Sequence, residues 1–192
     1  VLGSGDFEGK KGTRMSLWTP GCNIILVGMG DREGMSHKMA RNAGARLISS
    51  LSKKKGTDLT VRFTTGWTGD RMVDFAEGMM LRDYEFLEHQ EKPDDHIEKE
   101  WKVDFQASNR YHEKLSVELL NVQSVVKGVH TARDLGNEPA NVLYPMEYAR
   151  RAQEWAKGKK NVRVEVYDWE KLHELGMGGL INVGKGSDQK PC

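Results

Sequence analysis

One long periodic segment, Tyr111–Asp134, most constrains how this chain can fold. Its apolar residues recur at helical spacing and share one face: Leu115, Leu119, Val122, Val126 and Val129. Pro139 and Pro145 follow, and proline lacks the amide hydrogen that would continue a helix. The pattern therefore predicts a long helix that ends in a proline-bounded turn and connects two parts of the chain.

Four short segments ahead of this helix have strand patterns. They are Thr13–Thr19, Asn23–Gly28, Asp58–Thr65 and Val103–Ala107. Because Asn23–Gly28 is a continuous apolar and β-branched run, we expect a central strand that is covered on both faces. The other three alternate apolar and polar residues, which is typical of half-buried strands, and Thr13–Thr19 is expected at a sheet edge.

Two amphipathic helices are expected between these strands. Ser36–Lys53 carries apolar or small residues every fourth position, and Ser36 is a candidate cap. Gly69–Glu88 has a similar stripe that runs from Met72 to Leu87. Strands that alternate with helices predict an α/β layer, while the charged segment His89–Lys102 is expected to be an exposed loop.

A second unit is expected after the proline-bounded turn. Proline is tolerated in the first turn of a helix, so Pro145 can start one that runs to about Lys157. A strand at Val162–Val166, a short helix at Trp169–Leu175 and a further strand at Leu180–Val183 should follow. This β-α-β beginning needs more strands to bury its faces.

Composition indicates an ordinary globular protein of 192 residues, 38% hydrophobic and 30% charged. The formal net charge of +1 gives no reason to expect a nucleic acid or a membrane as partner. Cys22 and Cys192 follow no metal-ligand or redox spacing, which argues for a reducing compartment. Because no apolar run approaches the about 20 residues of a membrane span, we predict a cytoplasmic protein.

Three short segments resemble ligand-binding motifs, but their sequences do not fit those motifs. Gly28–Gly30 follows a strand, but Gly34 is misplaced for a dinucleotide fingerprint, so a tight turn is expected. Gly184–Ser187 fails the pattern of a phosphate-binding loop, because Gly186 stands directly after Lys185 where that pattern has serine or threonine. Lys53–Lys55 suits the carbonyl end of a helix better than it suits a nucleic acid.

Metal ligands do not converge in the sequence. The six histidines, none in a His-Glu-x-x-His pair, are His37, His89, His96, His112, His130 and His173. A site for two divalent cations needs several carboxylates around the two ions, and the sequence shows no such group. Arg133 and Glu138 suggest instead an ion pair within the connector. We predict no catalytic, cofactor-binding or metal-binding residue in this chain.

The run Arg133–Pro145, followed by Leu175–Leu180, resembles the leucyl (cytosol) aminopeptidase family of two-metal exopeptidases. Further segments follow that family's amino-terminal half in the same order: Phe7–Gly12, Ile25–Gly30, Ala76–Tyr84 and Val164–Asp168. The resemblance implies a macro-domain-like mixed α/β sheet flanked by helices at residues 1–110. A linker helix and turn at 111–141 and the start of an α/β catalytic domain at 142–192 would follow.

The resemblance also implies a function. The intact enzyme would release amino-terminal residues from peptides, often leucine, with two divalent cations such as zinc, manganese or magnesium, and would form a hexamer. Ser187–Pro191 does not match the family's metal-binding run, so Lys185 is not carried over as a catalytic residue. That run is expected beyond Cys192, and the chain, which starts at Val1 without methionine, is expected to be a truncated or processed product that is inert alone.

Two other hypotheses stay open. The macro-like sheet of a separate binding module would hold a nucleotide or DNA, since the resemblance includes relatives that bind DNA through this half. Alternatively, the chain would be a structural fragment that assembles with a separate catalytic part. Binding of ADP-ribose or DNA would distinguish the binding module from the aminopeptidase. The intact mass of the source protein would show whether a separate catalytic part exists.

Overall fold

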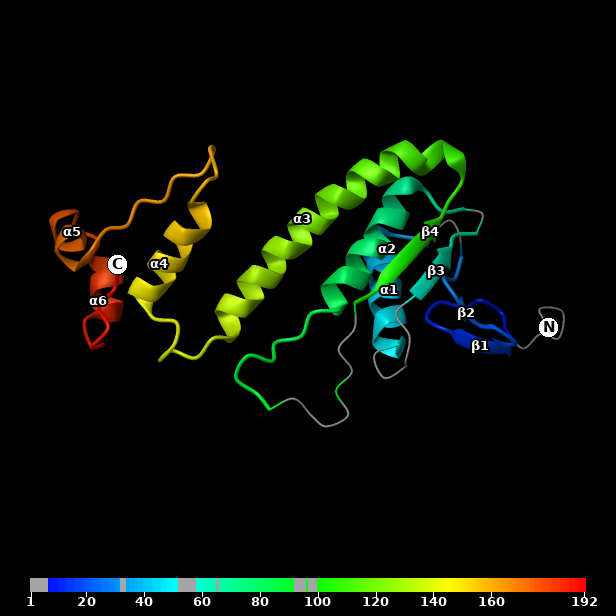
Figure 1. The fold of residues 1–192 in the computed structure, drawn as a ribbon, viewed down its shortest axis with the longest axis horizontal. Coiled ribbons are helices and arrows are strands. Elements are labelled where there is room, and N and C mark those ends of the chain that lie inside the picture. The colour runs from blue at the N-terminus through cyan, green and yellow to red at the C-terminus, as the bar shows by residue number, and fades with distance from the viewer. Residues whose placement is uncertain (1–6, 32–33, 52–57, 65, 92–95, 97–99) are drawn as a thin grey trace. The chain divides into compact units, whose positions relative to one another are not determined.

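A computed structural model of the chain describes residues 7–31, 34–51, 58–64, 66–91, 96 and 100–192 (Figure 1). The chain divides into two compact units, Val1–Ala132 and Arg133–Cys192. Among the described residues, no helix combines the length and apolar character that crossing a membrane requires. Lys53–Lys55 and half of the predicted charged loop, at 92–95 and 97–99, lie outside the described residues.

The first unit begins with an antiparallel hairpin of β1 (Arg14–Thr19) and β2 (Cys22–Val27). Gly21 in the turn has a φ of +88°, a conformation that glycine adopts without steric cost. The predicted edge strand is confirmed, but the prediction of a central strand at Asn23–Gly28 is wrong. Among the described strands β2 pairs with β1 alone, and Ile24 is 43% exposed.

Helices α1 (His37–Leu51) and α2 (Gly69–Arg82) confirm the two predicted amphipathic helices and pack side by side (Figure 1). Their backbones touch at two glycines. A Cβ added to Gly44 would lie 2.0 Å from the backbone oxygen of Phe75, and one added to Gly78 would lie 1.9 Å from that of Arg41. Since glycine has no side chain, the two helices approach more closely than any other residue would permit at these positions.

The start of α1 and the end of α2 each have an identifiable cause. At the start of α1, the Ser36 hydroxyl accepts a hydrogen bond from the Met39 amide at 3.3 Å, as predicted for a cap. At the other end of the pair, α2 stops at Arg82 rather than at the predicted Glu88. Asp83 accepts a hydrogen bond from the Trp101 indole at 2.7 Å, and the Tyr84 ring lies 5.1 Å from the His130 ring. These tertiary contacts hold the following residues off the helical path.

Strands β3 (Asp58–Arg62) and β4 (Lys102–Gln106) pair in parallel, and exposure alternates along each as predicted for half-buried strands. Their inner residues meet an aromatic cluster in which the Phe63 ring lies 4.8 Å from Trp67 and 5.7 Å from Phe105. The buried core of the unit comprises Ala40, Ala43, Leu47, Ile48, Leu51, Trp67, Met72, Phe75, Met79 and Leu115.

A short 3-10 turn, η2 (Asn109–Tyr111), leads into the long helix α3 (His112–Asn137). The predicted apolar stripe is the inner face: Leu115 is 6% exposed and Val126 is 4% exposed. Leu120 lies on the other side and is 64% exposed. The long helix that the periodicity predicted is therefore confirmed, and Leu115 connects its first turns to the core.

The second unit contains α4 (Pro145–Ala156), α5 (Trp169–Glu174) and α6 (Gly178–Gly184). The helices predicted from Pro145 and Trp169 are confirmed. The strand predicted at Val162–Val166 is wrong, because no described strand lies beside it to supply hydrogen bonds. Leu180–Val183 is also not a strand. It lies in α6, where helical hydrogen bonds link successive turns.

The described elements form the α/β fold that the sequence predicted, with small sheets and packed helices. Each of the two sheets has two strands, one antiparallel pair and one parallel pair. The domain boundaries predicted at 110/111 and 141/142 stay predictions.

Candidate functional site

The glycine turn after β2 is shaped by close backbone contacts. Gly28 is buried, and a Cβ there would lie 2.3 Å from the Lys10 backbone oxygen. Gly30 has a φ of +74°, and its amide donates to the Gly9 oxygen at 3.0 Å. Helix α1 begins at His37, seven residues after Gly30, so the turn does not lead directly into a helix. The geometry explains why glycine stands at 28 and 30 without a ligand.

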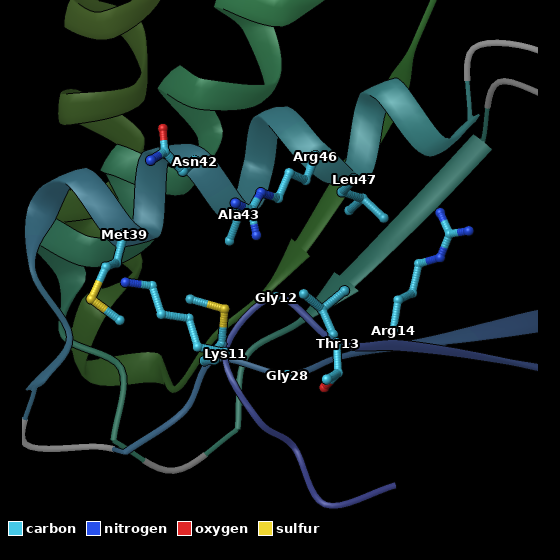
Figure 2. Close-up of a pocket in the computed structure, with 12 residues that line it drawn as sticks. Lys11, Gly12, Thr13, Arg14, Gly28, Met39, Asn42, Ala43, Arg46 and Leu47 are labelled. Carbon is cyan, nitrogen blue, oxygen red and sulfur yellow. The ribbon is translucent and has the colours of Figure 1, made fainter.

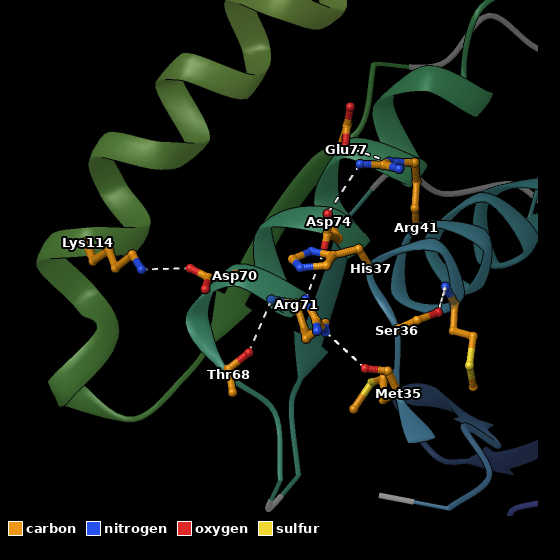
Figure 3. Close-up of polar contacts among 11 residues, drawn as sticks. Met35, Ser36, His37, Arg41, Thr68, Asp70, Arg71, Asp74, Glu77 and Lys114 are labelled. Atoms are coloured by element: carbon orange, nitrogen blue, oxygen red, sulfur yellow. Dashed lines mark hydrogen bonds and ion pairs between the residues drawn. The ribbon is translucent and has the colours of Figure 1, made fainter. Parts of the chain in front are cut away.

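A polar network joins α1 to α2 (Figure 3). Asp74, with a 10% exposed side chain, lies 2.5 Å from His37 Nδ1 and accepts a hydrogen bond from Arg41 at 3.3 Å. Arg41 Nε also donates to Glu77 at 2.6 Å. Arg71 lies 3.8 Å from Asp74 and donates to the Met35 backbone oxygen at 3.0 Å. Because both carboxylates already face cations, this network links the two helices and leaves neither Asp74 nor Glu77 without a charged partner.

A second contact joins α2 to α3 through Asp70 and Lys114, whose Nζ donates to the carboxylate at 2.6 Å (Figure 3). The hydrogen bond from Lys114 lowers the pKa of Asp70, and the same contact raises the pKa of Lys114. Both side chains are more than half exposed, so water and salt screen the pair strongly. It is a surface ion pair at the start of α3.

In the second unit, ion pairs connect the turn before α4 to residues of that helix. Glu138 has a 5% exposed side chain and accepts a hydrogen bond from Arg151 at 2.9 Å. Glu147 accepts from Arg150 at 2.7 Å and from Arg151 at 2.8 Å. These hydrogen bonds lower the pKa of Glu147 from 4.5 to about 2. The sequence predicted an ion pair between Glu138 and Arg133, and the structure shows an ion pair between Glu138 and Arg151.

Lys185 and the histidines do not gather into a catalytic group. Lys185 is exposed at the end of α6, and its Nζ donates to Asn182 at 3.2 Å. Taken separately, neither unit brings three histidine, cysteine or carboxylate ligand atoms within 4.8 Å of one another among the described residues. This donor set does not fit a pair of divalent cations, which need several converging carboxylate ligands.

A cavity of about 380 Å³ lies between the base of the hairpin and α1 (Figure 2). Apolar side chains line part of it, among them Val27, Met29, Met39 and Leu47. Three cationic residues also line it: Lys11, Arg14 and Arg46. Sequence reasoning missed this cavity, because its cations come from a loop, a strand and a helix that no local motif connects.

Two family models match the chain in order. The model described as the cytosol aminopeptidase family, N-terminal domain, covers residues 1–93. The model described as the catalytic domain of the same family covers residues 130–192. The chain belongs to the cytosol aminopeptidase family. The resemblance seen in the sequence is thereby confirmed, and this family is one of metallopeptidases.

Named relatives agree with the family models. The chain is 35% identical to a probable cytosol aminopeptidase of Sinorhizobium fredii, with 97% of this chain and 39% of the relative aligned. It is 34% identical to a probable cytosol aminopeptidase of Rhizobium meliloti over the same shares. The chain thus spans about two fifths of the length of these cytosol aminopeptidases.

Solved structures share the fold. A tomato leucine aminopeptidase mutant matches with a TM-score of 0.78 at 24% identity, over 97% of this chain and 37% of that chain. The bottromycin maturation enzyme BotP matches with a TM-score of 0.76 at 23% identity, over 96% and 40%. BotP in complex with Mn matches with a TM-score of 0.77 at 22% identity, over 96% and 39%. At these identities the similarity concerns the fold.

Proposed function

We propose that this chain is the amino-terminal portion of an aminopeptidase that releases residues from the amino termini of peptides. The observation that carries the proposal is the ordered match of two models of one family to residues 1–93 and 130–192. The proposed domains are an amino-terminal domain at 1–110, a linker at 111–141 and the opening of the catalytic domain at 142–192. Peptides are the substrate class that the family name implies.

The proposed enzyme uses two divalent cations, with zinc, manganese or magnesium as candidates. Support comes from the metallopeptidase family and from the neighbouring structure that was solved with Mn. The ligand atoms in each described unit do not fit such a pair, so we propose that residues 1–192 contribute no metal ligand and no catalytic side chain. Bound metal would supply a nucleophilic water near neutral pH.

The chain's own residues have a structural part in this proposal. The buried carboxylate of Glu138 and its partner Arg151 fix the start of α4, the first helix that follows the proline-bounded turn. A charge-assisted hydrogen bond of this kind restrains backbone geometry more than a neutral one. The proposed role of the segment is therefore to hold the entry of the catalytic domain in one conformation.

Assembly and location extend the proposal. We expect the whole enzyme to form a hexamer and to work in the cytoplasm, in keeping with relatives that are named cytosol aminopeptidases. Size-exclusion chromatography coupled to light scattering measures the mass of the whole protein in solution. A mass of six protomers agrees with the proposal, and a monomer contradicts the proposed assembly.

Hydrolysis of a leucyl chromogenic substrate tests whether this chain supplies structure while the rest of the enzyme supplies the catalytic site. The 192-residue chain with Mn²⁺ is expected to show no turnover above a metal-only blank. A chimera that carries this chain in place of the aligned portion of the Sinorhizobium fredii relative is expected to hydrolyse the substrate. The relative's remaining portion alone serves as the control. Turnover by the isolated chain that persists through purification contradicts the inert role, and an inactive but folded chimera contradicts the family function.

A further inference from the structure

The cavity between the hairpin and α1 carries an uncompensated positive charge (Figure 2). Lys11 and Arg14 come from the hairpin side, and Arg46 comes from α1. Within the described part of the chain, these three cations form no ion pair, and no carboxylate lines the cavity. Like charges held near one another repel, and a bound anion relieves that repulsion.

Glycine lets one of these cations approach the hairpin backbone. A Cβ added to Gly12 would lie 2.6 Å from Arg46 Nη1. Figure 2 shows Lys11, Arg14 and Arg46 drawn around Gly12. Arg46 is an exposed residue, and its guanidinium lies against Gly12, next to Lys11 in the sequence. Guanidinium groups bind phosphate oxygens with two parallel hydrogen bonds, and an ammonium adds a point charge.

The rest of the cavity suits an apolar body. Leu47 is 7% exposed, and Val27, Met29 and Met39 are half-buried. A volume of about 380 Å³ falls within the range of small-molecule sites, which are mostly apolar with a few placed polar groups. Methionine adapts its shape to irregular ligands. An apolar floor beside three cations therefore matches a ligand that has both an apolar body and a negative charge.

We propose that this cavity binds a small phosphate monoester with an apolar body, of the size of a nucleoside monophosphate. A phosphate dianion balances several cations better than a single carboxylate does. In the proposed complex, Arg46 and Lys11 contact the phosphate, and the apolar body lies against Met29, Met39 and Leu47. This binding is independent of peptide hydrolysis.

Calorimetry with the 192-residue chain tests the proposal through three matched probes: adenosine monophosphate, adenosine and inorganic phosphate. We expect adenosine monophosphate to bind with a Kd on the order of 0.1 mM. Adenosine and phosphate alone should each bind at least about tenfold more weakly, because each lacks one half of the contacts. Equal affinity for adenosine, equal affinity for phosphate, or no binding of the monophosphate overturns the proposal.

Two variants that each remove one positive charge from α1 test whether the ligand binds in this cavity. Arg46→Gln should weaken binding of adenosine monophosphate by about tenfold, whereas Lys38→Gln removes the same charge from the same helix outside the cavity and should leave binding unchanged. Circular dichroism establishes that both variants fold. In wild type, the amide resonances of Gly12 and Gly28 should shift on titration. Unchanged affinity in folded Arg46→Gln, or shifts confined to other residues, contradicts the assignment.

Discussion

At the scale of single residues, glycines in helices behave in two different ways. Gly44 and Gly78 stand where two helix backbones touch, so a side chain has no room. Gly128 lies in α3 with nothing within 4 Å of an added Cβ. From the sequence all three read as weak points of helices. Only the packing partner, which is remote in the chain, separates the necessary glycines from the tolerant one.

Gly44→Ala should therefore destabilise the first unit, and Gly128→Ala should not. At Gly44 the new methyl group collides with the Phe75 carbonyl and forces the helices apart, at a cost of about 1–3 kcal/mol. At Gly128 alanine gains about 0.5–1 kcal/mol, because it loses less backbone entropy in a helix. Urea unfolding followed by circular dichroism measures both. Equal stability of the two variants contradicts the observed helix contact.

Glu147 predicts a pH dependence of the second unit. Its pKa is about 2 when folded and 4.5 as an ordinary carboxyl, so the unfolded state binds the proton more readily. The stabilisation by Arg150 and Arg151 is fully present above pH 4.5 and is lost as the pH falls through about 2. Glu147→Gln should lower the thermal stability of the unit at pH 6 and have little effect near pH 2.

Carboxyl resonances followed by NMR give the Glu147 titration directly. A midpoint near the ordinary value of 4.5 contradicts the hydrogen bonds from the two arginines. Glu170 is a suitable control for the Glu147→Gln variant, because it is exposed in the first turn of α5. At pH 6, Glu170→Gln should change the thermal stability much less than Glu147→Gln does, because among the described residues no arginine donates a hydrogen bond to Glu170.

At the scale of elements, helices were more predictable than strands. The stripes of α1, α3 and α4 repeat over several turns, so periodicity alone identified them. A strand also needs a neighbour, and the sequence does not say which one. This is why Val162–Val166 alternates without pairing, and why β2 reads as central although it pairs with β1 alone among the described strands. Leu180–Val183 was misassigned because three apolar residues within four positions fit a short strand or a helix equally well.

The two faces of α3 make a matched test at this scale. Leu115→Ala should cost about 2–5 kcal/mol, because it opens a cavity in the core of the first unit. Leu120→Ala removes the same atoms from a side chain that is 64% exposed, so its effect should stay within about 0.5 kcal/mol. Chemical denaturation of the two variants gives the comparison. Similar losses for both contradict the assignment of the inner face.

At the scale of the whole molecule, the sequence identified the family from ordered segments, and the family models agree over residues 1–93 and 130–192. Candidate sites were harder to predict. The network around Asp74 and the cavity at Arg46 both combine residues from separate elements. Their residues are far apart in the sequence, so no local spacing pattern predicts either site. An ion pair of Glu138 with Arg133 was predicted, and the structure shows an ion pair of Glu138 with Arg151, which is 13 residues further along the chain.

Metal binding by the 192-residue chain tests the central claim most directly. The donor atoms within each described unit do not converge, so equilibrium dialysis against micromolar Mn²⁺ followed by elemental analysis should find no stoichiometric ion on the purified chain. Two tightly held ions per chain, together with hydrolysis of a leucyl substrate, would contradict the claim that these residues supply structure without the metal centre.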